Sequence, residues 1–222
     1  MKAFLLCLIG LLPYVLFAQN KEELIQQIKS NPDKTETTQL IQRIGGNAPD
    51  YKELESLFKG LDRKVKKSTQ GKILKRYIDA LKKSSPGKKA PGITQFDLEG
   101  EPYSLQDLKG KYVLVSFWAS WNTASREEIP LYVDIYREFK DKNFEILGVS
   151  FDNDFKAWKK YIDDNKLDWK HISDLQNMNN GAALGYGIKA IPQHVLVNPA
   201  GIIVARNLSG DALKEKLREL LK

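Results

Sequence analysis

The amino-acid sequence predicts an α/β protein in which a central mixed sheet is flanked by helices and preceded by a helical N-terminal region. From residue 93 onwards, short β-type runs alternate with helical patterns, as in a sheet that is covered on both sides. The run Tyr112–Trp118 is almost continuously apolar, as expected of a strand buried on both faces. Between residues 20 and 85, apolar residues instead recur at the three-and-four spacing of helices.

Residues 1–18 have the pattern of a secretory signal peptide. The basic Lys2 precedes an apolar run over residues 3–17, and Ala18 is the small residue that a signal peptidase prefers before its cut. The run is too short to span a membrane. We therefore expect export to the periplasm or cell envelope, with no integral membrane span in the mature chain. Cys7, the single cysteine, is not predicted to carry a lipid anchor, because no small residue directly precedes it.

Residues 19–85 are predicted to form several short helices that pack as a small bundle. Breaks fall at residues 31–33, 45–49 and 68–71, where Gly, Pro, Asn and Ser gather. A linker-like composition over residues 84–92 places the domain boundary at residues 85/86. Apolar stripes of this kind are usually core; here they comprise Leu24, Ile25, Ile28, Leu40, Ile41, Ile44, Tyr51, Leu54, Leu57, Phe58, Leu61, Val65, Ile73, Leu74, Tyr77, Ile78 and Leu81.

Residues 86–222 carry the alternating β and α patterns of the second domain. A hairpin turned at Glu99-Gly100 opens it. We expect a sheet of four or five strands, with residues 112–118 central and the hairpin at one edge. The predicted strands cover residues 93–98, 102–105, 112–118, 144–151, 193–197 and 202–207, and the predicted helices cover 126–140, 155–164, 179–185 and 211–222. A short apolar piece spans residues 169–172.

The chain has 35 Lys and Arg against 28 Asp and Glu, a formal net charge of +7. The basic residues are interpreted as interspersed with acids along the chain, which favours a solvated basic surface with weak attraction for anionic lipid or acidic partners. No combination of aromatic and basic residues typical of single-stranded nucleic-acid binding is recognised. We therefore predict no nucleic-acid partner.

Several segments after residue 90 carry a family resemblance. They are Ala90-Pro91, residues 105–111, 117–121, 126–130, 148–150 and 186–192. In this order the chain resembles the TlpA/ResA-like thioredoxins, a branch of the thioredoxin superfamily related to the alkyl hydroperoxide reductase and thiol-specific antioxidant proteins. The resemblance implies a thioredoxin-like fold for residues 86–222.

The family's redox chemistry depends on Trp-Cys-x-x-Cys at the start of a helix, whose N-terminal dipole stabilises the attacking thiolate. The matching run here is Trp121-Asn122-Thr123-Ala124-Ser125. The resemblance places Asn122 at the attacking-thiol position and Ser125 at the resolving-thiol position. Without sulfur, neither can exchange disulfides. We therefore predict no catalytic residues for this chemistry, no cofactor and no metal.

Further positions match the surroundings of that motif. Glu128 matches an acidic residue that, in several family members, lies near the disulfide and tunes it; alternatively it is a first-turn acid that complements the helix dipole. Pro192 matches the family's cis-proline. The resemblance implies a groove formed by Trp121, Ile191, Pro192 and Gln193, which could hold an extended peptide. Trp121 could equally pack on the helix below it.

Two features of the replaced motif remain open at this point. Asn122 is favoured as the N-cap of the helix, although Ser125 and Glu128 have capping-box spacing. Ser125, His194 and Glu128 could also form a hydrolytic constellation. A metal site is disfavoured, because His171 and His194 are isolated and the predicted mature chain has no thiol.

The leading functional hypothesis is a non-catalytic binder that holds an extended segment of another envelope protein. One alternative is a residual enzyme with hydrolytic chemistry. The other is a structural subunit that associates through the helical region.

Overall fold

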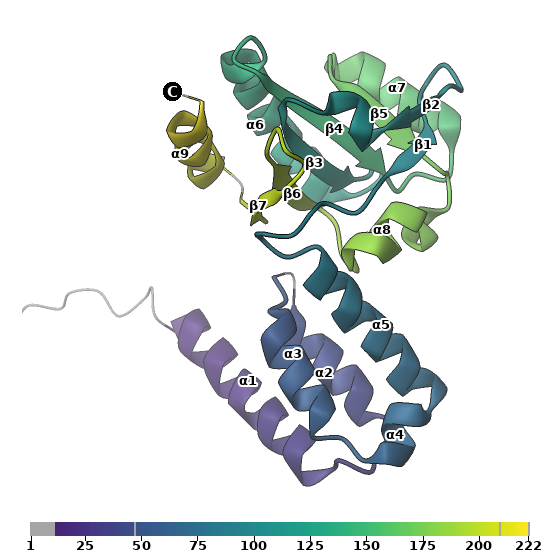
Figure 1. The fold of residues 1–222 in the computed structure, drawn as a ribbon, viewed down its shortest axis with the longest axis vertical. Coiled ribbons are helices and arrows are strands. Elements are labelled where there is room, and N and C mark those ends of the chain that lie inside the picture. The colour runs from purple at the N-terminus through teal and green to yellow at the C-terminus, as the bar shows by residue number, and fades with distance from the viewer. Residues whose placement is uncertain (1–11, 47, 209, 222) are drawn as a thin grey trace, which may run out of the picture. The chain divides into compact units, whose positions relative to one another are not determined.

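The computed structural model describes residues 12–46, 48–208 and 210–221 (Figure 1). The chain divides into two compact units between Ile78 and Asp79, inside helix α5 (Thr69–Lys83). Most of the predicted leader lies outside the described residues, and residues 12–18 form the start of helix α1 (Leu12–Ser30). None of the described helices has the length and apolar character needed to cross a membrane.

The first unit is a bundle of short helices. They are α1, α2 (Thr37–Gly45), α3 (Tyr51–Lys59), α4 (Arg63–Lys67) and the beginning of α5. Asp50 caps α3 by accepting a hydrogen bond from the backbone N–H of Lys52 at 2.9 Å. The predicted apolar stripes do supply the core, which includes the fully buried Ile41, Leu54 and Leu74. The prediction was wrong for Ile73, whose side chain is 42% exposed.

The last residues of α5 belong to the second unit, so the division lies before the predicted boundary at residues 85/86. The Ser84 hydroxyl donates to the backbone carbonyl of Tyr186 at 2.9 Å. Leu81 packs so closely on Gly187 that a Cβ there would lie 2.9 Å from the Leu81 side chain. These contacts tie the end of α5 to the chain segment that precedes the last two strands.

The second unit is built on one mixed sheet of seven strands in the order β2-β1-β5-β4-β3-β6-β7. Strands β3, β4 and β5 run parallel, and the other pairs are antiparallel. The predicted count of four or five strands was wrong: seven strands form the sheet, and the short β5 lies in it between β4 and the predicted edge hairpin. The strands are β1 (Thr94–Phe96), β2 (Pro102–Ser104), β3 (Tyr112–Trp118), β4 (Phe144–Ser150), β5 (Lys170–Ser173), β6 (Gln193–Val197) and β7 (Ile203–Arg206).

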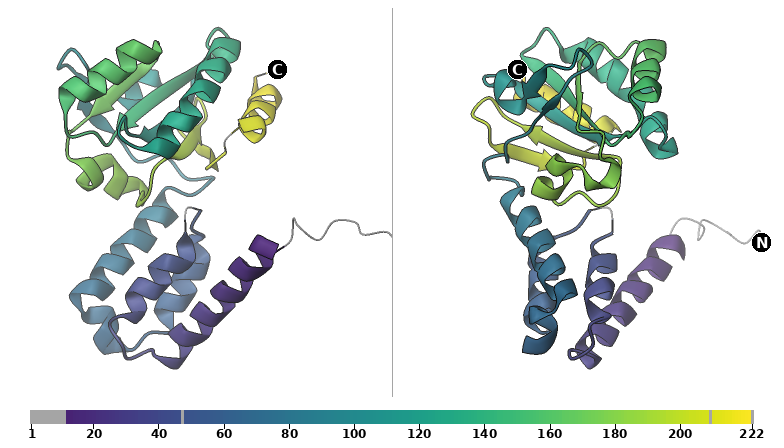
Figure 2. Two further views of the ribbon diagram at one scale, coloured as in Figure 1. Left: turned by 180° about the vertical axis from the view of Figure 1, so that it is seen from behind. Right: turned by 90° about the vertical axis from the view of Figure 1, so that its right-hand side faces the viewer.

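Helices cover both faces of this sheet (Figure 2). One face packs against α6 (Thr123–Phe139), α7 (Phe155–Asn165) and α9 (Gly210–Leu220). The other packs against α8 (Gly181–Tyr186) and residues 90–108, which include the 3-10 turn η1 (Leu105–Leu108); a second such turn, η2, spans Asn177–Asn179. Apolar side chains of β3 point to both faces of the sheet and join the core on each side. The strand is therefore buried on both faces.

A buried histidine lies between the sheet and α7. The ring of His171 on β5 is 5.3 Å from the ring of Trp118 and 5.5 Å from that of Trp169. Gly148 on β4 makes room for it, because a Cβ there would lie 2.4 Å from His171 Nδ1. Burial lowers the pKa of His171 to about 3, against a smaller opposing effect of the Leu167 backbone carbonyl. The imidazole is therefore neutral in the folded protein at neutral pH.

We predict that His171 makes folding sensitive to acid. The pKa of His171 is lower in the folded than in the unfolded chain. Its contribution to the free energy of unfolding is therefore complete above pH 6.5 and is lost as the pH falls towards 3. At pH 4.5 this loss amounts to about 2–3 kcal/mol. Urea unfolding at pH 7.5 and 4.5 should show a smaller pH dependence for His171→Leu than for the parent chain. An unchanged difference between the two pH values would contradict the assignment.

Candidate functional site

The N-terminus of α6 follows the end of β3 and begins within the segment Trp121-Asn122-Thr123-Ala124-Ser125. Asn122 has the extended backbone of an N-cap (φ −86°, ψ 119°), and its Oδ1 accepts a hydrogen bond from the backbone N–H of Ser125 at 2.8 Å. The prediction of Asn122 as the cap is confirmed. The helix therefore begins at Thr123. Ser125 points inward at 2% exposure, and its hydroxyl has no hydrogen-bond partner within the described residues.

The loop before α6 is held by a buried carboxylate that sequence reasoning missed. Asp152 accepts hydrogen bonds from the backbone N–H of Ser120 at 3.0 Å and from its hydroxyl at 2.5 Å. The hydroxyl of Ser150 donates to the same carboxylate at 2.6 Å. The available signal was an acid placed directly after the buried apolar run 144–151. A buried carboxylate needs several donors, and here those donors fix the loop that carries Trp121.

Trp121 stands at the surface beside this anchored loop. Its indole N–H donates to the backbone carbonyl of Phe151 at 3.3 Å, while 47% of the residue remains exposed. This hydrogen bond holds one edge of the indole ring against the protein. Much of its apolar surface is left available to a partner.

A compact polar cluster links α6 to β6. His194 Nε2 lies 2.8 Å from Glu128 Oε2 and 2.7 Å from the Tyr132 hydroxyl, which donates to Glu128 at 3.1 Å. Partial burial by itself would raise the pKa of the Glu128 carboxyl, but the hydrogen bond and charge of His194, together with Tyr132, lower it. Burial, together with the nearby Glu128 charge, raises the pKa of Tyr132. The first-turn interpretation of Glu128 was wrong, because α6 begins at Thr123 and Glu128 falls in its second turn.

The hydrogen bonds indicate which ring nitrogen of His194 faces the cluster. Its Nδ1 is buried and has no partner within the described residues. A proton on Nε2 can be donated to Glu128, whereas a proton on Nδ1 would be buried without an acceptor. Of the three residues in the hydrolytic hypothesis, the structure therefore joins Glu128 and His194. Ser125 forms no hydrogen bond to either of them.

The loop before β6 lies at the same end of the sheet as the motif. The Ile191–Pro192 peptide bond is cis, and Gln193 pairs with Phe117 near the end of β3. Ile191 and Pro192 are partly exposed. Gln193 as a whole residue, backbone included, is only 3% exposed, and its side-chain Oε1 has no partner within the described residues. Gln193 therefore offers an outside ligand almost no surface.

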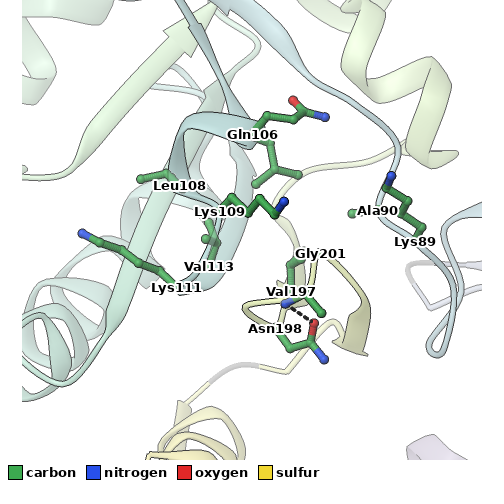
Figure 3. Close-up of a pocket in the computed structure, with 12 residues that line it drawn as sticks. Lys89, Ala90, Gln106, Leu108, Lys109, Lys111, Val113, Val197, Asn198 and Gly201 are labelled. Atoms are coloured by element: carbon green, nitrogen blue, oxygen red, sulfur yellow. Dashed lines mark hydrogen bonds between the residues drawn. The ribbon is translucent and has the colours of Figure 1, made fainter.

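The opposite end of the sheet has a cavity of about 250 Å³ (Figure 3). Val113 at the start of β3 and Val197 at the end of β6 lie on its wall, together with Lys89, Lys109 and Lys111. Figure 3 shows Lys111 pointing away from the other lining side chains, and Lys111 pairs with Glu145 at 3.4 Å. The Asn198 side chain accepts from the backbone of Ala200 and braces the turn beside the cavity. None of the sequence-predicted site residues lines it.

Comparison with known proteins agrees with this architecture. The profile of the AhpC/TSA family matches residues 86–206. The thiol-disulfide oxidoreductase ResA of Bacillus cereus is 30% identical over 147 residues, which are 66% of this chain and 82% of that protein. The thioredoxin-like protein YneN of Bacillus subtilis is 31% identical over 120 residues, 53% of this chain and 68% of that protein.

Solved structures show the same similarity. The crystal structure of the thioredoxin domain of a thiol-disulfide oxidoreductase from Bacteroides vulgatus matches with a TM-score of 0.59 at 39% identity, covering 62% of this chain and 99% of that domain. The solution structure of a thiol:disulfide interchange protein from a Bacteroides species matches with a TM-score of 0.57 at 39% identity, over 62% and 90% of the two chains. This chain therefore belongs to the AhpC/TSA family and, within it, to the TlpA/ResA-like thioredoxins, with Trp121-Asn122-Thr123-Ala124-Ser125 in place of Trp-Cys-x-x-Cys.

Proposed function

We propose that this chain is an exported protein of the cell envelope that holds an extended segment of another protein without covalent trapping. The proposed binding surface comprises Trp121, Ile191 and Pro192; Gln193 of the predicted groove is buried behind it. One observation carries the proposal: Asn122, at the attacking-thiol position, caps α6 through its bond to the Ser125 N–H. The helix start is thus stabilised by a residue that has no nucleophile.

Covalent chemistry at the motif finds no support in its side chains. An amide can donate and accept hydrogen bonds but does not attack carbonyls or disulfides. The Ser125 hydroxyl is buried, and a serine needs a neighbouring base to become a nucleophile. The candidate base, His194, already forms hydrogen bonds with Glu128 and Tyr132. These facts favour a non-enzymatic role over the hydrolytic alternative.

Non-covalent capture is physically adequate for such a surface. An extended segment can pair with exposed backbone while an apolar side chain rests on an aromatic anchor. Trp121 has the features of an anchor, since its N–H is satisfied by Phe151 and its ring is half exposed. The bonds from Ser120 to Asp152 limit the movement of its loop, which reduces the entropy lost on binding.

The proposed location rests on the sequence of residues 1–18, which has the composition of a signal peptide. Association through the helical region remains the alternative for a structural subunit. It would leave the Trp121 surface free.

We predict that Trp121→Ala weakens capture of cysteine-free peptides from an immobilised peptide library by about 1–2 kcal/mol, the scale for loss of an aromatic anchor. The melting temperature should stay nearly unchanged, because the ring is half exposed. Phe96→Ala is the matched control, since Phe96 is also exposed but lies on β1, which β5 and β4 separate from β3. If both variants capture peptides as well as the parent chain does, the interface lies on the helical unit instead. A large loss of stability would show that Trp121 serves the core.

We also predict that the purified chain neither reduces insulin nor oxidises a model dithiol above a buffer blank, because thiolate attack needs sulfur. The assay should use the chain without its predicted leader, which removes Cys7 from the reaction. Turnover in the absence of added thiol and metal would refute the loss of redox function.

Restoring both sulfur atoms tests what the motif has lost. In Asn122→Cys combined with Ser125→Cys we expect a disulfide to form, since the side chain at position 122 already reaches the backbone of residue 125 at 2.8 Å. We expect weak reductase activity, because Ala124 and the surrounding residues are not adapted to disulfide exchange. Mass spectrometry before and after alkylation detects the bond. Two free thiols under oxidising conditions would contradict the inferred geometry.

A further inference from the structure

The positive charge of the chain is concentrated in one short segment of the helical unit. Residues 59–76 contain eight basic residues and one acid, Asp62, a net charge of 8 − 1 = +7. The rest of the chain then has 35 − 8 = 27 basic and 28 − 1 = 27 acidic residues, a net charge of zero. The interpretation of interspersed charge was therefore wrong. The eight residues, called here the cationic surface, are Lys59, Arg63, Lys64, Lys66, Lys67, Lys72, Lys75 and Arg76.

Most of this charge is exposed and is not neutralised within the protein. Arg63, Lys64, Lys67, Lys72 and Arg76 are exposed, and in the part of the chain that the structure describes none of them forms an ion pair. Elsewhere on the cationic surface, Lys59 pairs with Glu55 at 3.1 Å, and Lys66 donates to the Lys59 carbonyl at 3.0 Å. Uncompensated like charges repel each other. An external anion would relieve that repulsion.

The packing of α4 on α5 gathers these cations. Gly71 in α5 sits so close to α4 that a Cβ there would lie 2.1 Å from the Val65 carbonyl oxygen and 2.8 Å from that of Lys66. Only glycine permits this approach. It lets basic residues of α4 and α5 border a broadly open pocket of about 550 Å³, which is lined by Phe58, Lys66, Lys72, Lys75 and Arg76. Such a pocket combines several cations with one apolar ring.

The side chains of this region favour a lipid surface over a nucleic acid. Phe58 and Tyr77 are both buried, so neither ring offers a platform on which bases could stack. Ile73 instead lies exposed between Lys72 and the following basic residues of α5. An apolar side chain within a basic surface can enter the boundary between headgroups and acyl chains. Lysines and arginines near an anionic leaflet are each attracted to it.

We propose that the cationic surface, together with the exposed Ile73 of α5, binds the surface of an anionic phospholipid bilayer. Phosphate headgroups neutralise the exposed lysines and arginines of α4 and α5, and one headgroup occupies the pocket beside Phe58. Ile73 contacts the acyl boundary. Attachment is peripheral and electrostatic, so it weakens as salt screens the charges.

Flotation of the full-length chain with vesicles tests this binding. Vesicles of phosphatidylcholine alone are compared with vesicles that also contain about 30% phosphatidylglycerol, at about 50 and 500 mM salt. We expect strong recovery only with the anionic vesicles at low salt, and at least about tenfold weaker binding at high salt. Residues 1–18 are present in every sample, so their contribution is common to all. Equal recovery with neutral and anionic vesicles would overturn the proposal.

Charge-reversal variants locate the surface. Lys72→Glu with Arg76→Glu should weaken binding to anionic vesicles at least about tenfold, and the milder Lys72→Gln with Arg76→Gln should weaken it less, by several-fold. Lys89→Glu with Lys109→Glu makes the same change in net charge at exposed positions beside the other cavity, and should have little effect. Ile73→Ser should reduce binding without any change in charge. Far-UV circular dichroism checks that each variant is folded.

Two results would overturn the proposal. Equal losses in the two charge-reversal pairs would show that only net charge matters. Tighter binding to polyglutamate or to single-stranded DNA than to anionic vesicles, at equal anion concentration, would assign the surface to an acidic macromolecule instead.

Discussion

The start of α6 is the constraint on which the candidate site depends. The first backbone N–H groups of a helix need acceptors, and Asn122 supplies one from the position where relatives have a nucleophilic cysteine. The helix thereby keeps its place at the end of β3, and Ser125 turns inward. Asp152 fixes the preceding loop through Ser120. The family architecture is thus maintained by hydrogen bonds that have no redox role.

The cluster of Glu128, Tyr132 and His194 joins α6 to β6 through side-chain hydrogen bonds. Its carboxylate accepts from a tyrosine one turn later on α6 and from a histidine on β6. Such a bridge couples the helix to the sheet just below the motif. Charge-assisted hydrogen bonds are stronger than neutral ones, so the cluster stabilises the attachment of α6 to β6.

The two units differ in the chemistry that they offer to partners. The sheet unit offers a half-exposed tryptophan and a loop with a cis-proline at one end of the sheet. The helical unit offers uncompensated positive charge around an open pocket. A protein with both properties can be held at an anionic surface by one unit while the other unit holds an extended segment.

The sequence by itself determined the element order, the edge hairpin, the N-cap at Asn122 and the absence of sulfur from the motif, because these follow from local pattern and residue identity. Tertiary structure decided the rest. The hairpin and β5 complete a seven-stranded sheet only through pairing between distant segments. His194 meets Glu128 across 66 residues, and Asp152 meets Ser120 across 32. Ile73 fits the apolar stripe, yet it lies outside the core, since a helix can bury only one face and the packing of α5 selects Leu74, Tyr77 and Ile78.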